Sequence, residues 1–372
     1  MTRVKPQVAV IYTHFPHYRK GVFDALRASQ KHDYHFFYDP HGVDETIRSA
    51  DVRQADTHIQ TYSFAGLMIQ PGFARYCLSA RFDAYIFLGN PYILSTWVYA
   101  SLLRLRRGKV AFWTHGWLSP REGPKGAIRS LFYRLADVLL LYGSRAKEIG
   151  KSLGFPEDRM QVIYNSMNYN EQEAARRRQV GRPAEFSVPY FLCVSRLVAD
   201  VQLELAIEAI ATLVQVSKTG VKLVVVGDGP ERERLRKLAS EGQADVEFLG
   251  PIYDEDRLAG LFMNSLAVVS PGKVGLLAMH SLAYGTPVIT HNNFEMQMPE
   301  SEAIDHLKTG YLFRYGDLDG LVEGMSKYLS KGIIEDDRKR LIGVIENSYT
   351  PEAQLELIET SIEELLLRDC TL

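Results

Sequence analysis

Short apolar runs alternate with amphipathic, helix-like segments along the whole chain. The first run, residues 7–12, is followed by a helical pattern that begins at Gly21, and the same order then repeats. Short runs that are apolar at nearly every position are typical of parallel strands buried on both faces. The pattern therefore predicts an α/β protein with doubly wound sheets. Further strands, some of them with the turn that follows, are predicted within residues 34–38, 61–64, 82–88, 110–117, 135–144, 160–166, 190–196, 223–230, 246–252, 266–269, 288–290 and 309–312.

One stretch, residues 270–291, combines most of the local signals. A predicted strand runs into Pro271-Gly272, Gly275 follows, and a helix is predicted for residues 276–283 before the next strand. A glycine-containing turn that opens a helix leaves backbone N–H groups without intrahelical partners and so suits a phosphate. The alternative is a tight strand–helix turn that binds no ligand.

Other glycine-containing turns surround this stretch in a recognisable order. The chain carries Ser195-Arg196-Leu197, then residues 227–230 (Gly-Asp-Gly-Pro), 248–250, 275–289 and 309–312. This order resembles the C-terminal half of the retaining glycosyltransferases of the GT-B fold, family 4. The resemblance implies two Rossmann-like domains that face a central cleft, and it covers essentially the whole chain.

Length and composition fit two soluble domains. The chain has 372 residues, of which 46% are apolar and 24% charged, so a large core is expected and disorder is not. No apolar run reaches the length that crosses a bilayer, and a strand near the N-terminus argues against a signal peptide. The three cysteines are far apart and predict neither disulfides nor a metal site, which favours the cytosol. We predict domains at 1–185 and 186–350, with 171–183 as the linker and 351–372 as a helix that crosses back to the first domain.

Charge divides unevenly between the two halves. Residues 1–185 contain 26 Lys and Arg against 16 Asp and Glu, whereas the remainder contains 17 against 29. A basic first half suggests an anionic partner, such as a phospholipid surface, a lipid-diphosphate acceptor or a nucleic acid. Of these we predict a lipid-linked or glycan acceptor and an anionic membrane surface, and no nucleic acid. The alternative is that two domains merely carry complementary charges.

The resemblance assigns most donor-site residues to the second half. Arg196 matches the arginine that binds the donor diphosphate, and with the N–H groups near Gly275 it would stabilise the departing diphosphate. Backbone groups near Gly250 would read the nucleotide base. The donor-binding residues predicted in this way are Arg196, Gly227, Gly229, Gly250, Ile252, Gly275 and Leu276. In the loop 291–300, Asn292 and Glu295 are candidates for contacts with sugar hydroxyls.

The chain departs from the family pattern at three positions. The lysine expected five residues after Arg196 is Val201, and Lys273 is the candidate replacement. Where the resemblance expects two glutamates within residues 270–291, the chain has Gly272 and His280. Imidazole both donates and accepts hydrogen bonds, so His280 remains a candidate for the ribose hydroxyls. Loss of the first carboxylate leaves three alternatives: backbone groups take over, the sugar lacks the hydroxyl, or the site is inactive.

The first half offers candidates for the acceptor and for the reacting centre. His115 follows the strand 110–113 and matches the family histidine under the donor sugar, so with Arg196 it is predicted to be catalytic; a structural role is the alternative. Basic residues 104–109 beside Trp97 suggest anionic lipid or a solvated helix end. The predicted acceptor-binding residues are His14, His17, Tyr18, Arg19 and Arg121, of which Arg19 can fork onto an anionic group.

Together these observations predict a glycosyltransferase that moves a sugar from a nucleoside diphosphate sugar to a polysaccharide- or lipid-linked acceptor. The resemblance implies retention of configuration, no metal and no cofactor. The expected setting is bacterial surface glycan or lipopolysaccharide assembly, in the cytoplasm or on the inner face of the membrane. The alternatives are a non-catalytic nucleotide- or sugar-binding protein and a nucleotide-sugar epimerase or hydrolase of the same fold.

Overall fold

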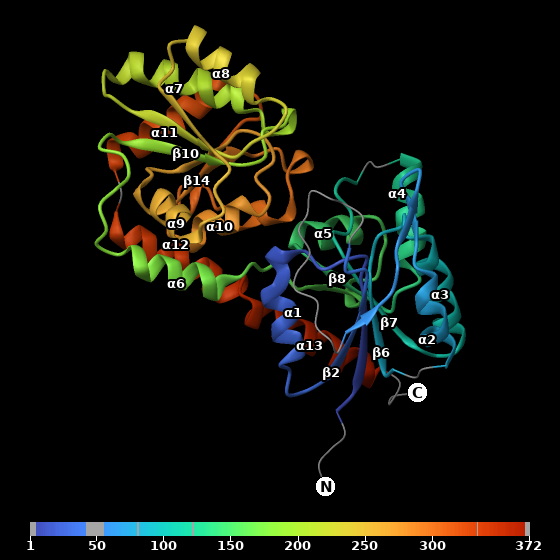
Figure 1. Cartoon of the computed structure of the whole chain (residues 1–372). Coiled ribbons are helices and arrows are strands. Elements are labelled where there is room, and N and C mark those ends of the chain that lie inside the picture. Colours follow the sequence, from blue (N-terminus) through green and yellow to red (C-terminus); the bar gives the residue numbers. More distant parts are fainter. Residues whose placement is uncertain (1–4, 42–55, 80–81, 121–122, 333, 369–372) are drawn as a thin grey trace. The chain divides into compact units, whose positions relative to one another are not determined.

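The chain forms two compact α/β units, seen in a computed structural model that describes residues 5–41, 56–79, 82–120, 123–332 and 334–368 (Figure 1). The N-terminal unit comprises residues 1–168 and 350–372, and the C-terminal unit comprises residues 169–349. The boundary therefore lies at Asn168 and not at residue 185. The predicted linker is mostly α6 (Tyr169–Gln179), which packs against α9 (Glu255–Asn264) of the C-terminal unit.

The N-terminal unit is built on a seven-stranded sheet with the order β3-β2-β1-β6-β7-β8-β9. All of its strand pairs are parallel, and its central strands are buried on both faces, as their continuous apolar runs predict. The strands are β1 (Gln7–Ile11), β2 (Asp33–Tyr38), β3 (Thr57–His58), β6 (Ala84–Leu88), β7 (Lys109–Thr114), β8 (Val138–Leu141) and β9 (Met160–Val162).

Helices cover both faces of this sheet and enclose two apolar cores. On one face α1 packs against α13, the last helix of the chain, and on the other face α2, α3, α4 and α5 supply the core. The helices are α1 (Lys20–Arg27), α2 (Ala74–Ser79), α3 (Leu94–Leu105), α4 (Gly123–Tyr133), α5 (Ser144–Ser152) and α13 (Pro351–Leu367).

A small hairpin lies outside the main sheet. Residues 61–64 were expected to form a strand of that sheet, but β4 (Tyr62–Phe64) pairs antiparallel with β5 (Leu67–Ile69) instead. The main sheet takes Thr57–His58 as its edge strand. The reason is local: Ala65-Gly66 adopts positive φ at both residues and turns the chain back after Phe64.

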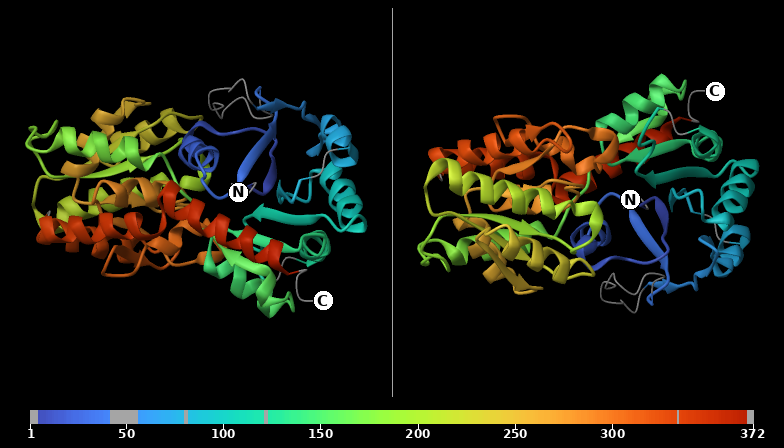
Figure 2. Two further views of the ribbon diagram at one scale, coloured as in Figure 1. Left: turned by 90° about the horizontal axis from the view of Figure 1, so that it is seen from below. Right: turned by 90° about the horizontal axis from the view of Figure 1, so that it is seen from above.

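The C-terminal unit repeats the same architecture with six parallel strands in the order β12-β11-β10-β13-β14-β15. Two further cores lie on the two faces of this sheet, and Figure 2 gives two more views of these layers. The strands are β10 (Tyr190–Val194), β11 (Lys222–Val226), β12 (Val246–Gly250), β13 (Val268–Ser270), β14 (Val288–His291) and β15 (Gly310–Phe313). The remaining helices are α7 (Leu203–Ser217), α8 (Arg232–Glu241), α10 (Leu277–Ala283), α11 (Leu318–Lys331) and α12 (Glu335–Ser348).

Candidate functional site

The loop that follows β10 is held from one side by the glycine turn after β11. Gly227 has a φ of 135°, and a Cβ atom there would lie 1.9 Å from the carbonyl oxygen of Ser195. A Cβ on Gly229 would lie 2.3 Å from the carbonyl oxygen of Leu197. The N–H of Leu197 donates to the carbonyl of Asp228 at 2.9 Å. Both glycines are therefore required for close backbone approach, and they line the site through the backbone.

The turn after β13 holds the same loop from the other side. The N–H of Gly272 donates to the carbonyl of Val201 at 3.0 Å, and that of Lys273 approaches the carbonyl of Asp200 at 3.4 Å. Because β10, β11 and β13 are parallel neighbours, their carboxyl ends meet at one edge of the sheet. The structure thus brings together the three turns that the sequence singled out.

Arg196 lies in the middle of this arrangement and is exposed. Within the ranges that the structure describes, its guanidinium has neither an ion-pair partner nor a side-chain hydrogen bond. The N–H groups of Gly275 and Leu276 likewise have no hydrogen-bond acceptor among the described residues. An exposed cation and unpaired backbone donors that both lie in turns at the carboxyl edge of one parallel sheet are suitable groups for binding an anion.

The helix after this turn is shorter than predicted. α10 begins at Leu277 and has only seven residues, so its dipole contributes little to an anion site. Gly275 takes a φ of 49°, and the preceding N–H, that of Val274, donates to the side-chain oxygen of Gln297 at 2.9 Å. The case for a diphosphate therefore depends on Arg196 and the turn, not on the helix.

The structure explains why no glutamate stands at position 272. A Cβ on Gly272 would lie 2.0 Å from the carbonyl oxygen of Asp200, so any side chain there would displace the loop after β10. Lys273 lies next to that loop, and its Nζ is 2.9 Å from the carboxylate of Asp200. The ammonium is therefore close to Val201, where the resemblance expects a lysine, but Asp200 already pairs with it.

His280 is held by a carboxylate from another element. Its Nε2 lies 2.8 Å from Oε1 of Glu255, and the hydroxyl of Tyr284 donates to the same oxygen. Burial raises the pKa of Glu255, but the hydrogen bonds from His280 and Tyr284 outweigh it, so the pKa lies below its ordinary value. Glu255 begins α9, three residues after Ile252 of the segment 250–252 predicted to read the base.

The loop after β14 is anchored by a residue that the sequence analysis missed. The Nε2 of Gln297 donates to Oγ1 of Thr290 at 2.9 Å, and its oxygen accepts from Val274. Gln297 is buried, and its polar position inside a loop was the only sequence signal. The predicted residues Asn292 and Glu295 are exposed on the same loop.

His291, the last residue of β14, is fully buried with 0% of its surface exposed. Its Nδ1 accepts the N–H of Asn293 at 3.1 Å, its Nε2 has no partner among the described residues, and the ring lies 4.8 Å from that of Tyr315. Burial lowers the pKa of His291 to about 4. The folded C-terminal unit therefore favours the neutral form of the His291 imidazole.

This burial predicts a pH-dependent loss of stability. Since the unfolded chain binds the proton more tightly, stability is lost as the pH falls from about 6.5 to about 4, by roughly 3 kcal/mol for this group. His291→Gln is expected to reduce that loss in urea unfolding measured at both pH values. His306→Gln, at an exposed histidine, is the matched control. An unchanged pH dependence in His291→Gln would contradict the prediction.

In the N-terminal unit, Arg19 lies in an aromatic cage and not on the surface. Its side chain is only 6% exposed, and its Nη1 donates to the hydroxyl of Tyr142 at 2.6 Å. The guanidinium carbon lies 4.5 Å from the centroid of the Trp113 ring. Its Nε and Nη2, like the indole Nε1 of Trp113, are buried without a hydrogen-bond partner in the described part of the chain. Sequence analysis predicted the charge but not the burial.

His115 follows β7 at the carboxyl edge of the first sheet. Its ring lies 4.6 Å from that of Tyr142, so it is a neighbour of the Arg19 cage. Removal from water and the charges of Arg19 and Arg129 lower the pKa of His115, so its imidazole is neutral at neutral pH. The side chain is nevertheless exposed at the surface.

The other predicted acceptor residues lie on the loop after β1. His17 and Tyr18 belong to a short 3-10 helix (His17–Arg19) and pack edge to face, with their ring centroids 5.5 Å apart. His14 is partly buried beside the hydroxyl of Thr13. Arg121 lies outside the described residues.

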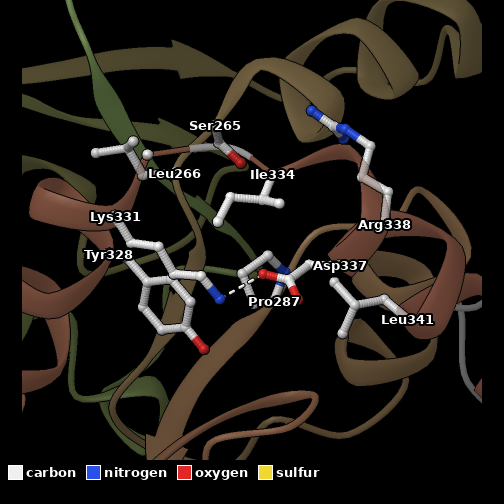
Figure 3. A pocket seen from close by; sticks show the side chains of 11 residues that line it. Ser265, Leu266, Pro287, Tyr328, Lys331, Ile334, Asp337, Arg338 and Leu341 are labelled. Carbon is white, nitrogen blue, oxygen red and sulfur yellow. Dashed lines mark hydrogen bonds and ion pairs between the residues drawn. The ribbon is translucent and has the colours of Figure 1, made fainter.

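A separate pocket in the C-terminal unit lies at the opposite edge of the sheet (Figure 3). Leu266 and Pro287, which line it, come just before β13 and β14, and Lys331 bridges to Asp337 across it. This edge carries the amino ends of the strands. The pocket is therefore not the site formed by the three turns.

Comparison with known proteins identifies a family that matches part of the chain. Residues 178–346 match the family described as glycosyl transferases group 1. An uncharacterized glycosyltransferase of Methanocaldococcus jannaschii is 27% identical over 211 residues, which are 53% of this chain and 52% of that protein. The match thus spans about half of the relative's length.

Two solved structures resemble almost the whole chain. The lipopolysaccharide outer core galactosyltransferase WaaB superposes with a TM-score of 0.70 at 16% identity, covering 96% of this chain and 99% of that one. HepE of Anabaena, solved in complex with UDP, also gives a TM-score of 0.70, at 15% identity, covering 97% and 100%. These likenesses confirm the predicted GT-B fold with two Rossmann-like domains.

The described residues contain neither a membrane-spanning helix nor a cluster of metal ligands. None of their helices is long and apolar enough to cross a membrane. They also contain no group of three or more His, Cys, Asp and Glu side chains placed to hold a metal ion.

Proposed function

Because residues 178–346 match the family described as glycosyl transferases group 1, we propose that the chain moves a sugar from a nucleoside diphosphate sugar to a lipid- or polysaccharide-linked acceptor. The proposed reaction retains the anomeric configuration and serves the assembly of a surface glycan such as lipopolysaccharide. The proposed location is the cytoplasm, or the inner face of the cell membrane.

The observation that carries the proposal is Arg196. Its guanidinium is exposed at the carboxyl edge of the second sheet, between two glycine turns, and has no ion-pair partner among the described residues. An exposed guanidinium can fork onto two phosphate oxygens, so an arginine in this position suits a diphosphate. We assign it to the leaving diphosphate, together with the N–H groups of Gly275 and Leu276.

Neighbouring residues complete the proposed donor site. Lys273 would leave Asp200 and turn to the diphosphate, which is a modest change because an exposed ion pair contributes little. Glu255 would orient His280 toward a ribose hydroxyl. The carboxylate that is missing from position 280 would thus be replaced by that of Glu255, which acts through the imidazole of His280. Gly250, Ile252, Asn292 and Glu295 are proposed for the base and the sugar.

The proposed chemistry follows from this charge arrangement. Arg196 and the backbone N–H groups stabilise the negative charge that develops as the glycosidic bond to the diphosphate breaks. The acceptor hydroxyl attacks from the face that the diphosphate leaves, and its proton passes to the departing phosphate oxygen. His115, as a neutral imidazole, hydrogen-bonds near the anomeric centre. In this scheme the protein's own cations neutralise the diphosphate, so no metal or cofactor is assigned.

The acceptor is assigned to the N-terminal unit through Arg19. A buried guanidinium with two unpaired nitrogens lowers the stability of the fold unless a hydrogen-bond acceptor reaches those nitrogens. An anionic group on the acceptor, such as a phosphate next to a lipid, would satisfy these N–H groups. His14, His17 and Tyr18 are proposed as further acceptor contacts on the same loop.

A calorimetric panel of UDP, GDP, dTDP, CDP and ADP, without metal, tests the donor site directly. We expect one of the five to bind at least about tenfold more tightly than the others. The five differ in their base, and the residues proposed for the base belong to the same site as those proposed for the diphosphate. Absence of binding to all five by a folded protein would overturn the proposal.

The absence of both carboxylates leaves a second candidate, a non-catalytic nucleotide-binding protein of the same fold. It predicts selective nucleotide binding without release of nucleotide from any sugar donor. An epimerase or hydrolase would instead turn over a nucleotide sugar in the absence of acceptor. Incubating the protein with the sugar donors of the nucleotide that binds separates these outcomes.

A further inference from the structure

Exposed apolar side chains concentrate in one part of the N-terminal unit. Of the 23 large hydrophobic residues that are exposed in the described part of the chain, 13 lie between residues 62 and 131. Phe64 and Leu105 are 85% and 82% exposed. Scattered exposed apolar residues are normal, but a concentration of this kind marks an interaction surface.

Eleven of these residues lie on the hairpin, on α3 and the residues just before it, and on α4, and we call them the apolar face. On α3, Leu94, Val98, Leu102 and Leu105 are exposed and follow one another at intervals of four, four and three, so they share one side of the helix. The opposite side of α3 is buried in the core. α3 is therefore apolar on both sides, which packing within the unit does not require.

The hairpin and α4 both contact α3 or the residues just before it. The N–H of Met68 donates to the carbonyl of Tyr92 at 2.8 Å, which fixes the hairpin beside the start of α3. The Trp97 ring of α3 packs 4.9 Å from that of Phe132 in α4. Figure 1 shows α2, α3 and α4 together on the same side of the first sheet. The exposed members of the apolar face are Tyr62, Phe64, Leu67, Ile69, Tyr92, Leu94, Val98, Leu102, Leu105, Ile128 and Leu131.

The charges around the apolar face have one sign. Residues 59–136 contain ten Lys and Arg but only two Asp and Glu. Arg104, Arg106 and Arg107 stand at the end of α3, next to Leu105, and all three are exposed. One of these cations, Arg104, pairs with Asp137, a carboxylate just outside the segment. Apolar side chains beside unbalanced positive charge match the chemistry of an anionic lipid interface.

We propose that the apolar face lies on an anionic phospholipid surface, with Phe64 and Leu105 inserted at the boundary between headgroups and acyl chains and the arginines on the headgroup phosphates. A second copy of the same face is a poor partner because it would bring two strongly basic surfaces together. The inference deepens the proposed function, since it places the protein where a lipid-linked acceptor is found. The inference rests on the proposed function for its biological role. Vesicle binding can be measured whether or not the protein transfers a sugar.

Co-sedimentation with vesicles tests the proposal. We expect the protein to bind vesicles of phosphatidylcholine with 30 mol% phosphatidylglycerol, and to bind pure phosphatidylcholine vesicles about tenfold more weakly. Raising NaCl from about 0.1 M to about 0.5 M is expected to release most of it. The double variant Phe64→Ser/Leu105→Ser is expected to lower the partition coefficient about tenfold.

The double variant Val180→Ser/Val216→Ser is the matched control, since these residues of the C-terminal unit are also strongly exposed. It is expected to bind vesicles like the unchanged protein. Wild-type protein that fails to bind anionic vesicles, or Phe64→Ser/Leu105→Ser protein that binds them equally well, would overturn the proposal. A dimer in sedimentation velocity that this variant dissolves would assign the face to a second copy instead. Nucleotide binding in the same variant reports on the proposed function separately.

Discussion

Replacing Arg196 with alanine is expected to weaken binding of the preferred nucleoside diphosphate by at least about tenfold and to slow transfer by about a hundredfold to a thousandfold. The first effect is the loss of one charge-assisted contact to the diphosphate. The second is larger because the charge on the diphosphate grows as the glycosidic bond breaks, so the guanidinium stabilises the transition state more than the bound donor. Calorimetry gives the affinity, and kcat and KM for the donor give the rate effect.

The exposed, unpaired state of Arg196 makes this variant easy to interpret. No hydrogen bond or ion pair of the described chain is broken, so the melting temperature is expected to change little. Arg177→Ala removes another exposed arginine, which pairs with Glu173 on α6, and serves as the control. Equal nucleotide affinity in Arg196→Ala and in the unchanged protein would remove the residue from the site.

The strands were predictable because their signal is local. A run such as 138–141 is apolar at every position, and a strand buried on both faces needs nothing else. The turns were predictable for the same reason, since Gly227 and Gly229 are fixed by close backbone approach. Residues 61–64 (Thr-Tyr-Ser-Phe) alternate polar and aromatic side chains, and they form a hairpin strand because the turn at Ala65-Gly66 decides their partner.

The environment of individual side chains was much harder to predict. Nothing in the sequence near Arg19 reveals that Tyr142, 123 residues later, would take its guanidinium into a buried cage. The role of Gln297 depends on Val274 and Thr290, which reach it only through the fold. The pairing of His280 with Glu255 likewise joins α10 to α9. Such contacts arise from tertiary packing, which periodicity and motif order do not encode.

The departures from the family pattern are matched to their surroundings. At position 272 the backbone of the loop after β10 occupies the space that a side chain would need. At position 280 a histidine has replaced a glutamate, and a glutamate on the neighbouring helix now bonds to it. Random decay of a site would leave cavities or unpaired groups at these positions. Compensation at both positions favours a reorganised donor site over an inactive one.

This interpretation makes Gly272→Glu, which restores the residue expected from the family, a damaging substitution. The new Cβ would lie 2.0 Å from the carbonyl oxygen of Asp200. The loop after β10 must then move, which breaks the hydrogen bond from the Gly272 N–H to the carbonyl of Val201 and shifts Arg196. We expect a loss of about 4 kcal/mol of unfolding free energy in urea titrations. Nucleotide affinity is expected to fall at least about tenfold as well, since Arg196 is carried by the same loop.

Two further variants separate the steric cause from the added charge. Gly272→Ala introduces the same Cβ without a carboxylate, so it is expected to lose nearly as much stability as Gly272→Glu. Gly220→Glu adds the same side chain at a glycine with no atom near its Cβ position, so it is expected to stay within about 0.5 kcal/mol of the unchanged protein. If Gly272→Glu instead kept its stability and bound the nucleotide more tightly, the carboxylate site would be restorable. The fit between Gly272 and the loop after β10 would then be incidental and not the basis of the donor site.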